Sequence, residues 1–313
     1  MQKEPLLGHF HPPLPKDVSL YNQEAVTEVS VEELLKYREV PKYNLFYTII
    51  QVILTMIFGI PKIVFGLVYG LIAGGFFILA ASMWRSFGKP ESWRMPLKKL
   101  WAILARVFLF LLGFYKITFK NSPDPDARFM VANHICFFDG WLFLPFLPRP
   151  LGKKELLDVP CIRDMCEIYH GIAVDRSKSC GLTKELISNA QDTSRPQIMI
   201  MPEGASTSGD YMLRYHLGAF LSDLPVQPAT IRYTLWGVSR KFSHISFFHN
   251  YPKHWLAFLC IPGISAEITF LEPMTIKSHG DNDPRKFADA VELRIGNTLG
   301  VRVLSLGTRV LYK

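Results

Sequence analysis

The sequence predicts an α/β domain, with a mixed sheet flanked by helices, preceded by N-terminal membrane helices. Over residues 115–300, short apolar segments typical of strands alternate with segments of helical pattern. Residues 45–83 contain one charged residue, Lys62, in an apolar run long enough to cross a bilayer. The hydrophobic share of 49% is high for a soluble enzyme, and this single run accounts for it.

Residues 1–43 are expected to form a polar N-terminal arm. They are rich in Pro, Glu and Val and show no clear core. One short helix is predicted within them, at residues 31–38.

The apolar run is placed at residues 44–84 as a helical hairpin or a pair of membrane spans. Two segments, 44–60 and 63–83, are expected to meet at a hinge, Gly59-Ile-Pro-Lys62. Basic residues flank both ends of the run, which favours both ends on the same, cytoplasmic side. Two topologies remain open: the chain crosses twice, or it dips in and returns on one face.

A third helix is predicted from Pro96 to Phe114, because proline suits a first turn. Lys99 and Arg106 lie on one face of it, and most other positions are apolar. This pattern fits an amphipathic helix at the membrane interface, so residues 85–118 are assigned to one. A helix buried under the catalytic sheet fits the same residues equally well.

Residues 119–313 are expected to form the catalytic domain. Half-exposed strands are predicted at 115–120 and 264–271, and buried strands at 129–133, 171–174, 197–201 and 226–233. A helix is predicted at 181–193. Another follows Asp283, with Pro284 at its first position and Gly300 ending it.

His134 and Asp139 stand at a His-x4-Asp spacing just after the strand at 129–133. A histidine held by a carboxylate can take a proton from a hydroxyl group. Residues five apart on a helix do not share a face, so contact requires His134 on a loop and Asp139 at the start of the next helix. A purely structural hydrogen bond would use the same spacing. His170 and Asp175 also fit, but an intervening strand would direct their side chains apart.

A second motif, Met201-Pro-Glu-Gly-Ala-Ser-Thr207, ends another apolar strand with a carboxylate and a turn of small residues. In α/β sheets the ends of strands face ligands, so this turn is placed to meet a polar head group. An ordinary Pro-Glu-Gly turn is the alternative interpretation.

The order and separation of these motifs resemble the phospholipid/glycerol acyltransferase family. The four matching stretches are Asn133-His134-x4-Asp139, Gly171-Ile-Ala-Val-Asp-Arg176, Pro202-Glu-Gly-Ala-Ser-Thr207, and Leu224-Pro-Val-Gln-Pro228 leading to Ile231-Arg-Tyr233. The stretches 195–204, 217–220 and 225–228 look most like the lysophosphatidylcholine acyltransferase branch. Two positions depart from the family pattern: Ala205 replaces the usual Thr, and His216 the usual Lys.

This resemblance implies a membrane-bound enzyme that moves an acyl chain from acyl-coenzyme A to the free hydroxyl of a lysophospholipid. Lysophosphatidylcholine is the favoured acceptor, followed by lysophosphatidylethanolamine or lysophosphatidic acid. His134 is implied as the general base and Asp139 as the residue that fixes its tautomer. The implied substrate contacts are Arg176, a phosphate ligand, and Glu203, Gly204, Ser206 and Thr207. Acyl-coenzyme A is a co-substrate, and neither a permanently bound cofactor nor a metal is expected.

The net charge of +8 suits an anionic membrane surface and the phosphates of coenzyme A. No basic run or aromatic-interleaved RNA motif occurs, so nucleic acid is not an expected partner. Five cysteines without zinc spacing fit a reducing cytosolic face, and the endoplasmic reticulum is the expected membrane. Cys136 is interpreted as a small buried residue rather than a nucleophile.

Two other functions remain open from the sequence. A serine lipase or hydrolase is suggested by Gly204-Ala-Ser-Thr-Ser-Gly209, which is one residue too long for a nucleophile elbow. A non-enzymatic membrane adaptor that retains the acyltransferase fold is the other. The presence of His134, Asp139 and Glu203 argues against the adaptor.

Overall fold

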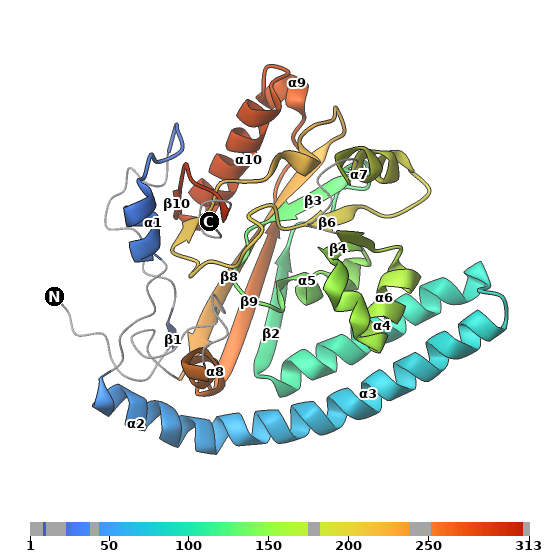
Figure 1. The fold of residues 1–313 in the computed structure, drawn as a ribbon, viewed down its shortest axis with the longest axis vertical. Helices are drawn as coiled ribbons and strands as arrows, with labels where there is room; N and C mark the ends of the chain where they lie inside the picture. Colours follow the sequence, from blue (N-terminus) through green and yellow to red (C-terminus); the bar gives the residue numbers. More distant parts are fainter. Residues whose placement is uncertain (1–8, 11–22, 38–43, 175–181, 238–251, 309–313) are drawn as a thin grey trace.

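A mixed sheet forms the centre of the molecule in the computed structural model, which describes residues 9–10, 23–37, 44–174, 182–237 and 252–308 (Figure 1). Its strands lie in the order β2 (Phe114–Lys120), β9 (Gly263–Phe270), β8 (Val226–Trp236), β3 (Phe129–Ala132), β6 (Ile198–Ile200), β4 (Arg149–Lys153) and β5 (Ile172–Val174). Neighbouring strands are parallel, except that β8 and β9 are antiparallel. A two-residue strand, β1 (His9–Phe10), pairs antiparallel with β8. The predicted mixed α/β architecture is therefore confirmed.

Helices cover both faces of this sheet. On one face Leu109, Leu142 and Phe258 come from α4 (Glu91–Leu111), α5 (Asp139–Leu142) and α8 (Pro252–Leu259). On the other face Leu186 and Val291 come from α7 (Leu182–Gln191) and α10 (Pro284–Leu299). The remaining elements are α6 (Pro160–Tyr169), α9 (Ile276–His279), the 3-10 turns Leu144–Phe146, Lys154–Asp158 and Leu217–Ala219, and a small sheet of β7 (Tyr211–Met212) and β10 (Arg302–Val303).

The C-terminal helix α10 begins and ends as its sequence predicts. The Asp283 carboxylate accepts hydrogen bonds from the backbone N–H groups of Arg285 (2.7 Å) and Lys286 (3.2 Å). At the other end Gly300 adopts a φ of 71°, a left-handed conformation that glycine takes without steric strain.

The apolar run forms one continuous helix of 42 residues, Leu45–Ser86, so the predicted hinge at Gly59-Ile-Pro-Lys62 is wrong. The helix consists of α2 (Leu45–Leu54), a π-turn (Thr55–Gly59) and α3 (Ile60–Ser86). Pro61 is the second residue of α3 and follows the π-turn, in which the Ile60 N–H donates to the Thr55 carbonyl, five residues back. Figure 1 shows a gently curved helix that runs along one side of the domain.

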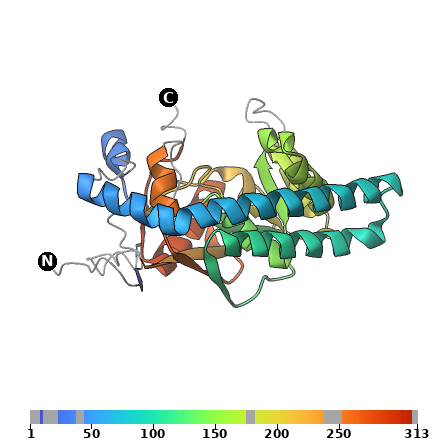
Figure 2. The ribbon, with the colours of Figure 1, turned by 90° about the horizontal axis from the view of Figure 1, so that it is seen from below.

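Helix α4 runs back antiparallel to α3, and the two lie side by side across the domain (Figure 2). It begins at Glu91, earlier than predicted, so Pro96 lies inside the helix. There the proline removes the bond that an N–H would donate to the Ser92 carbonyl. Trp101, Ala105 and Leu109 are buried between α3 and the catalytic domain, which fits the alternative of a helix under the domain.

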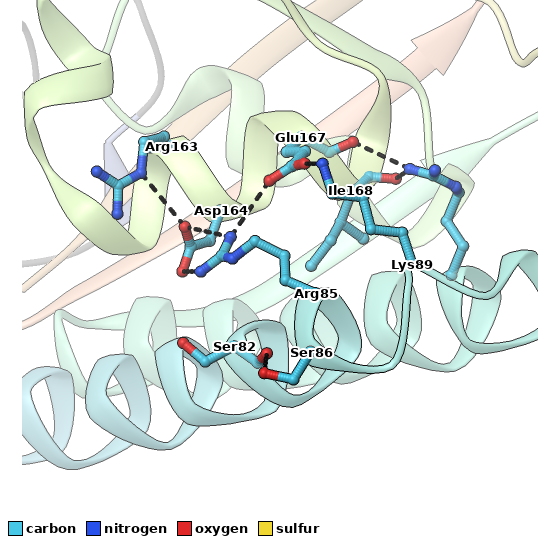
Figure 3. Close-up of polar contacts among 9 residues, drawn as sticks. Ser82, Arg85, Ser86, Lys89, Arg163, Asp164, Glu167 and Ile168 are labelled. Atoms are coloured by element: carbon cyan, nitrogen blue, oxygen red, sulfur yellow. Dashed lines mark hydrogen bonds and ion pairs between the residues drawn. The ribbon is translucent and has the colours of Figure 1, made fainter.

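Ion pairs fasten the turn between α3 and α4 to α6 (Figure 3). The Arg85 guanidinium binds both carboxylate oxygens of Asp164, at 3.0 and 3.1 Å, and Asp164 is fully buried. Arg85 and Lys89 also contact the Glu167 carboxylate, at 3.2 and 2.5 Å. Arg94 donates to the Glu167 carbonyl and stacks over the Trp84 ring. A bidentate pair of this kind sets orientation as well as distance, so the helical pair is held in one position against the domain.

Residues 23–37 differ from the polar arm without a core that the sequence predicts. Helix α1 (Val31–Tyr37) forms as expected, but its Leu34 side chain is fully buried against Tyr211, Leu213 and Leu304. The described part of this segment is therefore packed on the catalytic domain.

Candidate active site

His134 and Asp139 meet in the geometry that their spacing requires. The chain leaves β3 after Ala132, His134 lies on the following loop, and Asp139 is the first residue of α5. The His134 Nδ1 and Asp139 Oδ2 atoms are 2.9 Å apart. The Asp139 side chain is fully buried, whereas 24% of the His134 side chain is exposed. The Nε2 atom of His134 makes no hydrogen bond within the part of the chain that the structure describes.

Three further donors fix the Asp139 carboxylate. Its Oδ2 atom accepts hydrogen bonds from the backbone N–H groups of Ile135 (2.6 Å) and Cys136 (2.9 Å). Its Oδ1 atom accepts a hydrogen bond from the Tyr233 hydroxyl on β8. Burial, and then the charge of Asp139, raise the pKa of Tyr233 well above its usual range, so the phenol stays protonated and donates. The carboxylate therefore has one orientation, which directs Nδ1 inward and leaves Nε2 outward.

The sequence alone does not predict that Tyr233 binds Asp139, although this tyrosine ends the fourth motif. The signal available was its position at the carboxyl end of that motif, on a strand next to β3. Asn133 acts beside it: its side chain accepts from the Ile231 N–H (2.8 Å) and donates to the Ile231 carbonyl (3.0 Å). These two bonds extend the pairing of β3 with β8 by one residue and fix where the His134 loop begins.

Glu203 lies in the interior, directly behind His134. Its side chain is fully buried, and its Oε1 atom accepts a hydrogen bond from the His134 backbone N–H at 2.8 Å. Its Oε2 atom accepts one from the Leu213 backbone N–H at 2.9 Å. Burial raises the pKa of Glu203, and these two hydrogen bonds oppose that shift. Both carboxylate oxygens thus have protein partners, and neither faces solvent.

The rest of the third motif wraps around the same histidine. Thr207 is buried, and its backbone N–H donates to the His134 carbonyl at 2.8 Å. Gly204 has a φ of 73°, a left-handed conformation that favours glycine, and an added Cβ would also lie 2.9 Å from the His216 ring. Ser206 is half-buried in the same turn. Arg176 lies outside the described residues.

His170, the other histidine at a suitable spacing, lies at the opposite end of the sheet. It ends α6 just before β5 begins, whereas His134 follows the end of the parallel strand β3. Burial, then the charges of Arg94, Arg195 and Lys98, lower the pKa of His170 to about 4. Asp175, the other residue of that spacing, is outside the described residues.

Cys136 is fully buried, and burial together with Asp139 raises the pKa of its thiol well above the usual value. A protonated, enclosed thiol is a poor nucleophile. Across the described ranges, no group of three or more His, Cys, Asp or Glu side chains is placed to hold a metal. The chemistry available at this site is therefore proton transfer by an imidazole with one open nitrogen and one nitrogen held by a carboxylate.

Residues 116–232 match the protein-family model Acyltransferase. Lysophosphatidylcholine acyltransferase 1 of Homo sapiens is 28% identical over 240 residues, which cover 72% of this chain and 44% of that protein. Lysophosphatidylcholine acyltransferase 2B of Rattus norvegicus is 29% identical, over 68% of this chain and 42% of that protein. Lysophospholipid acyltransferase LPCAT4 of Mus musculus is 33% identical over 138 residues, or 42% of this chain and 26% of that protein.

The crystal structure of the 1-acyl-sn-glycerophosphate (LPA) acyltransferase PlsC from Thermotoga maritima has the same fold. It superposes with a TM-score of 0.57 at 20% identity, over 82% of this chain and 98% of that one. The chain spans less than half the length of the curated relatives it matches. The predicted resemblance to the acyltransferase family, and to its lysophosphatidylcholine branch, is confirmed by these matches.

Proposed function

We propose, from the match of residues 116–232 to the Acyltransferase family model, that the protein is a membrane-bound lysophospholipid acyltransferase that uses acyl-coenzyme A. The observation that carries the proposal is the His134–Asp139 pair, with Nδ1 held and Nε2 open. An imidazole in this state accepts a proton from a hydroxyl, and the carboxylate stabilises the imidazolium that results.

In the proposed reaction, His134 Nε2 takes the proton of the acceptor hydroxyl as the hydroxyl oxygen attacks the thioester carbonyl of acyl-coenzyme A. The new carbon–oxygen bond forms as the carbon–sulfur bond breaks. The same Nε2 atom returns its proton to the leaving sulfur, so coenzyme A departs as the thiol and His134 is restored. No covalent acyl-enzyme is required.

The test is an assay of the purified full chain in detergent with acyl-coenzyme A and a panel of lysophospholipids. We expect release of coenzyme A that matches formation of a diacyl product, without free fatty acid. Free fatty acid in proportion to the coenzyme A released would indicate a hydrolase. Absence of turnover with every acceptor would indicate a membrane adaptor.

We further propose that the acceptor is a zwitterionic lysophospholipid and that Arg176 binds its phosphate. His216 stands where the family usually has lysine, so one fixed positive charge fewer is available for a doubly charged phosphate. The structure places the His216 Nε2 atom 2.8 Å from the Thr308 hydroxyl, beside Gly204. Glu203, Gly204, Ser206 and Thr207 were also expected to contact the acceptor, and the half-buried turn at Gly204 and Ser206 is the part that remains accessible.

Arg176→Ala is expected to raise the apparent KM of the acceptor by roughly 10- to 100-fold, since a charged hydrogen bond contributes about 1.5–3 kcal/mol. The KM of acyl-coenzyme A should change far less. Lys120→Ala, which removes an exposed cation at the sheet edge, is the matched control and should change neither constant. When lysophosphatidylcholine and lysophosphatidic acid compete at equal concentration, lysophosphatidylcholine should be acylated faster. A clear preference for lysophosphatidic acid, or loss of acyl-coenzyme A binding in Arg176→Ala, would contradict the assignment.

We propose that the helix Leu45–Ser86 attaches the enzyme to a membrane, with the endoplasmic reticulum as the expected one. Among the described residues this is the one helix long and apolar enough to cross a bilayer. Its buried face includes Gly66, Ala73 and Phe77, and much of the rest is apolar and exposed. The exposed large side chains of α3 include Ile63, Val64, Phe65, Leu67, Val68, Leu71, Ile72, Phe76, Leu79 and Met83. Water disfavours so large an apolar surface, and lipid does not.

The full chain is therefore expected to stay in the membrane fraction through washes with high salt or alkaline carbonate. Replacing Leu71 and Ile72 together by glutamate should release a substantial fraction, because these side chains are 69% and 67% exposed. Leu156→Glu, at an exposed apolar site on the catalytic domain, is the control and should not release it. Release of the unmodified chain by salt alone would mean that it is held only by charge at the membrane surface.

A further inference from the structure

We propose that the N-terminal clamp, residues 23–34, positions His134 through two of its residues. Thr27 begins a backbone ladder, a series of main-chain hydrogen bonds that ends, through Glu203, at the N–H of His134, and Leu34 packs against the segments that carry this ladder. The inference rests on the proposed function in taking His134 as the base. It also assigns Glu203 a positioning role, in place of the acceptor contact that the family resemblance implies.

The outer part of the ladder joins the clamp to the C-terminal strand. The Thr27 backbone N–H donates to the Val303 carbonyl at 2.7 Å, and the Ser305 N–H donates to the Thr27 carbonyl at 2.9 Å. These are the two bonds of a parallel bridge between Thr27 and Leu304. The clamp is thus paired through one bridge with the residue that follows β10.

The inner part of the ladder joins β10 to β7. The strands pair in parallel, Arg302 with Tyr211 and Val303 with Met212. The Leu304 N–H donates to the Met212 carbonyl at 3.0 Å. The residue after Met212 is Leu213, whose N–H donates to Glu203. A continuous series of main-chain bonds therefore leads from Thr27 to the carboxylate that holds His134.

The Glu203 carboxylate connects this series of main-chain hydrogen bonds to His134. Its two oxygens are bound at 2.8 Å to the His134 N–H and at 2.9 Å to the Leu213 N–H, and the side chain is fully buried. A buried carboxyl group that loses one of two donors has no water to replace it and must move. A displacement of Leu213 is thereby passed to His134.

An apolar cluster fixes the clamp to the same strand. Leu34, Tyr211, Leu213 and Leu304 are each no more than 1% exposed, and Val29, Ala205 and Leu306 pack against them. Ala205 belongs to the third motif and stands where the family usually has threonine. Its methyl group packs against the cluster and is partly buried. The third motif and the clamp therefore share one apolar cluster.

The sequence of the clamp is suited to holding one conformation. Ser30 and Glu33 form a capping box at the start of α1: the Glu33 N–H donates to Ser30 Oγ at 3.2 Å, and the Ser30 N–H to Glu33 Oε2 at 2.9 Å. At the other end, the Gln23 N–H donates to the Asn297 side chain at 3.0 Å, and the Gln23 amide to the Val301 carbonyl at 2.8 Å. The first residue of the clamp is therefore anchored to the catalytic domain, and the start of α1 is capped within the clamp itself.

The experiment compares Leu34→Asp with Val31→Asp in the full-length protein. Both place a carboxylate on α1, but Leu34 is buried in the cluster and Val31 is 47% exposed. In Leu34→Asp we expect kcat to fall about 10-fold or more, because small displacements of a catalytic group have large effects on rate. The KM values of both substrates should stay within about 3-fold, since the clamp touches neither. Val31→Asp should match the unmodified protein.

Hydrogen exchange, followed by mass spectrometry, provides a readout that does not depend on activity. Peptides that contain the His134 and Leu213 amides should exchange faster in Leu34→Asp than in the unmodified protein, and at the unmodified rate in Val31→Asp. Thr27→Pro removes one ladder donor without disturbing the cluster, and it should shift exchange and kcat in the same direction by a smaller amount. If Leu34→Asp does not fold, the comparison with Thr27→Pro still decides the question.

Two results would overturn the inference. One is faster exchange in the clamp itself with unchanged exchange at His134 and Leu213. The other is an unchanged kcat when all three segments exchange faster. If the unmodified protein transfers no acyl group, the proposed function fails, and the exchange experiment still tests the mechanical connection from the clamp to His134.

Discussion

His134→Ala is expected to lower kcat by about 10²–10⁴-fold while the protein still folds, which is the usual contribution of a positioned general base. The side chain is partly exposed, and its polar contact within the described structure is with Asp139, so its removal leaves no large cavity. The measurement is steady-state acyl transfer, with the melting temperature as a check on folding.

His170→Ala is the matched control. This histidine is neutral near pH 7, because its pKa lies at about 4, and it lies at the end of the sheet away from His134. We expect the kcat of His170→Ala to stay within a few-fold of the kcat of the unmodified protein. Equal losses in the two variants would show that the base is not His134 alone and that the spacing at His170 carries chemistry.

Local sequence signals identified most of the sheet. Every strand that was predicted from an alternating or continuous apolar run has a counterpart in the structure. The Asp283 cap and Gly300 predicted the ends of α10 to within a residue. Strand β4 was not predicted because Pro150 and Gly152 are typical of turns. It forms because pairing with β6 on one side and β5 on the other outweighs the local preference.

The long helix shows that a proline in the sequence does not always end or bend a helix. Gly59 and Pro61 suggested a hinge, yet the helix continues because Pro61 falls in the first turn after a π-turn. Close approach also favours glycine there: an added Cβ on Gly59 would lie 3.0 Å from Leu259. The neighbour that makes this contact is about 200 residues away in the sequence, so no local pattern reveals it.

The candidate site likewise contains contacts that local sequence predicts and contacts that it does not. The contact between His134 and Asp139 follows from their spacing and from the strand before them, both of which are local. The partners of Glu203 do not, because they are main-chain N–H groups on two other segments, and a sequence does not show where an N–H points. A glutamate in a Pro-Glu-Gly turn therefore suggested a surface contact, whereas its carboxylate is enclosed.

Asp139→Asn is expected to lower kcat by about 10²–10⁴-fold, in the range seen when the carboxylate of a catalytic triad is replaced by its amide. The amide can keep its oxygen toward the Ile135 and Cys136 N–H groups, with its NH2 group facing the Tyr233 hydroxyl, which can rotate to accept. The shape of the site is then retained, and the negative charge beside the imidazolium is lost.

Tyr233→Phe separates charge from hydrogen bonding at the same carboxylate. It removes one of the four donors to Asp139 and leaves the carboxylate and its contact with His134 in place. We expect a loss in kcat of less than about 10-fold and a loss of stability of about 1–3 kcal/mol, measured by unfolding, for the unpaired buried acceptor. The order of rates should be unmodified protein, Tyr233→Phe, Asp139→Asn. If Asp139→Asn keeps nearly full activity while Tyr233→Phe does not, the carboxylate serves only to hold the loop, and the charge has no part in proton transfer.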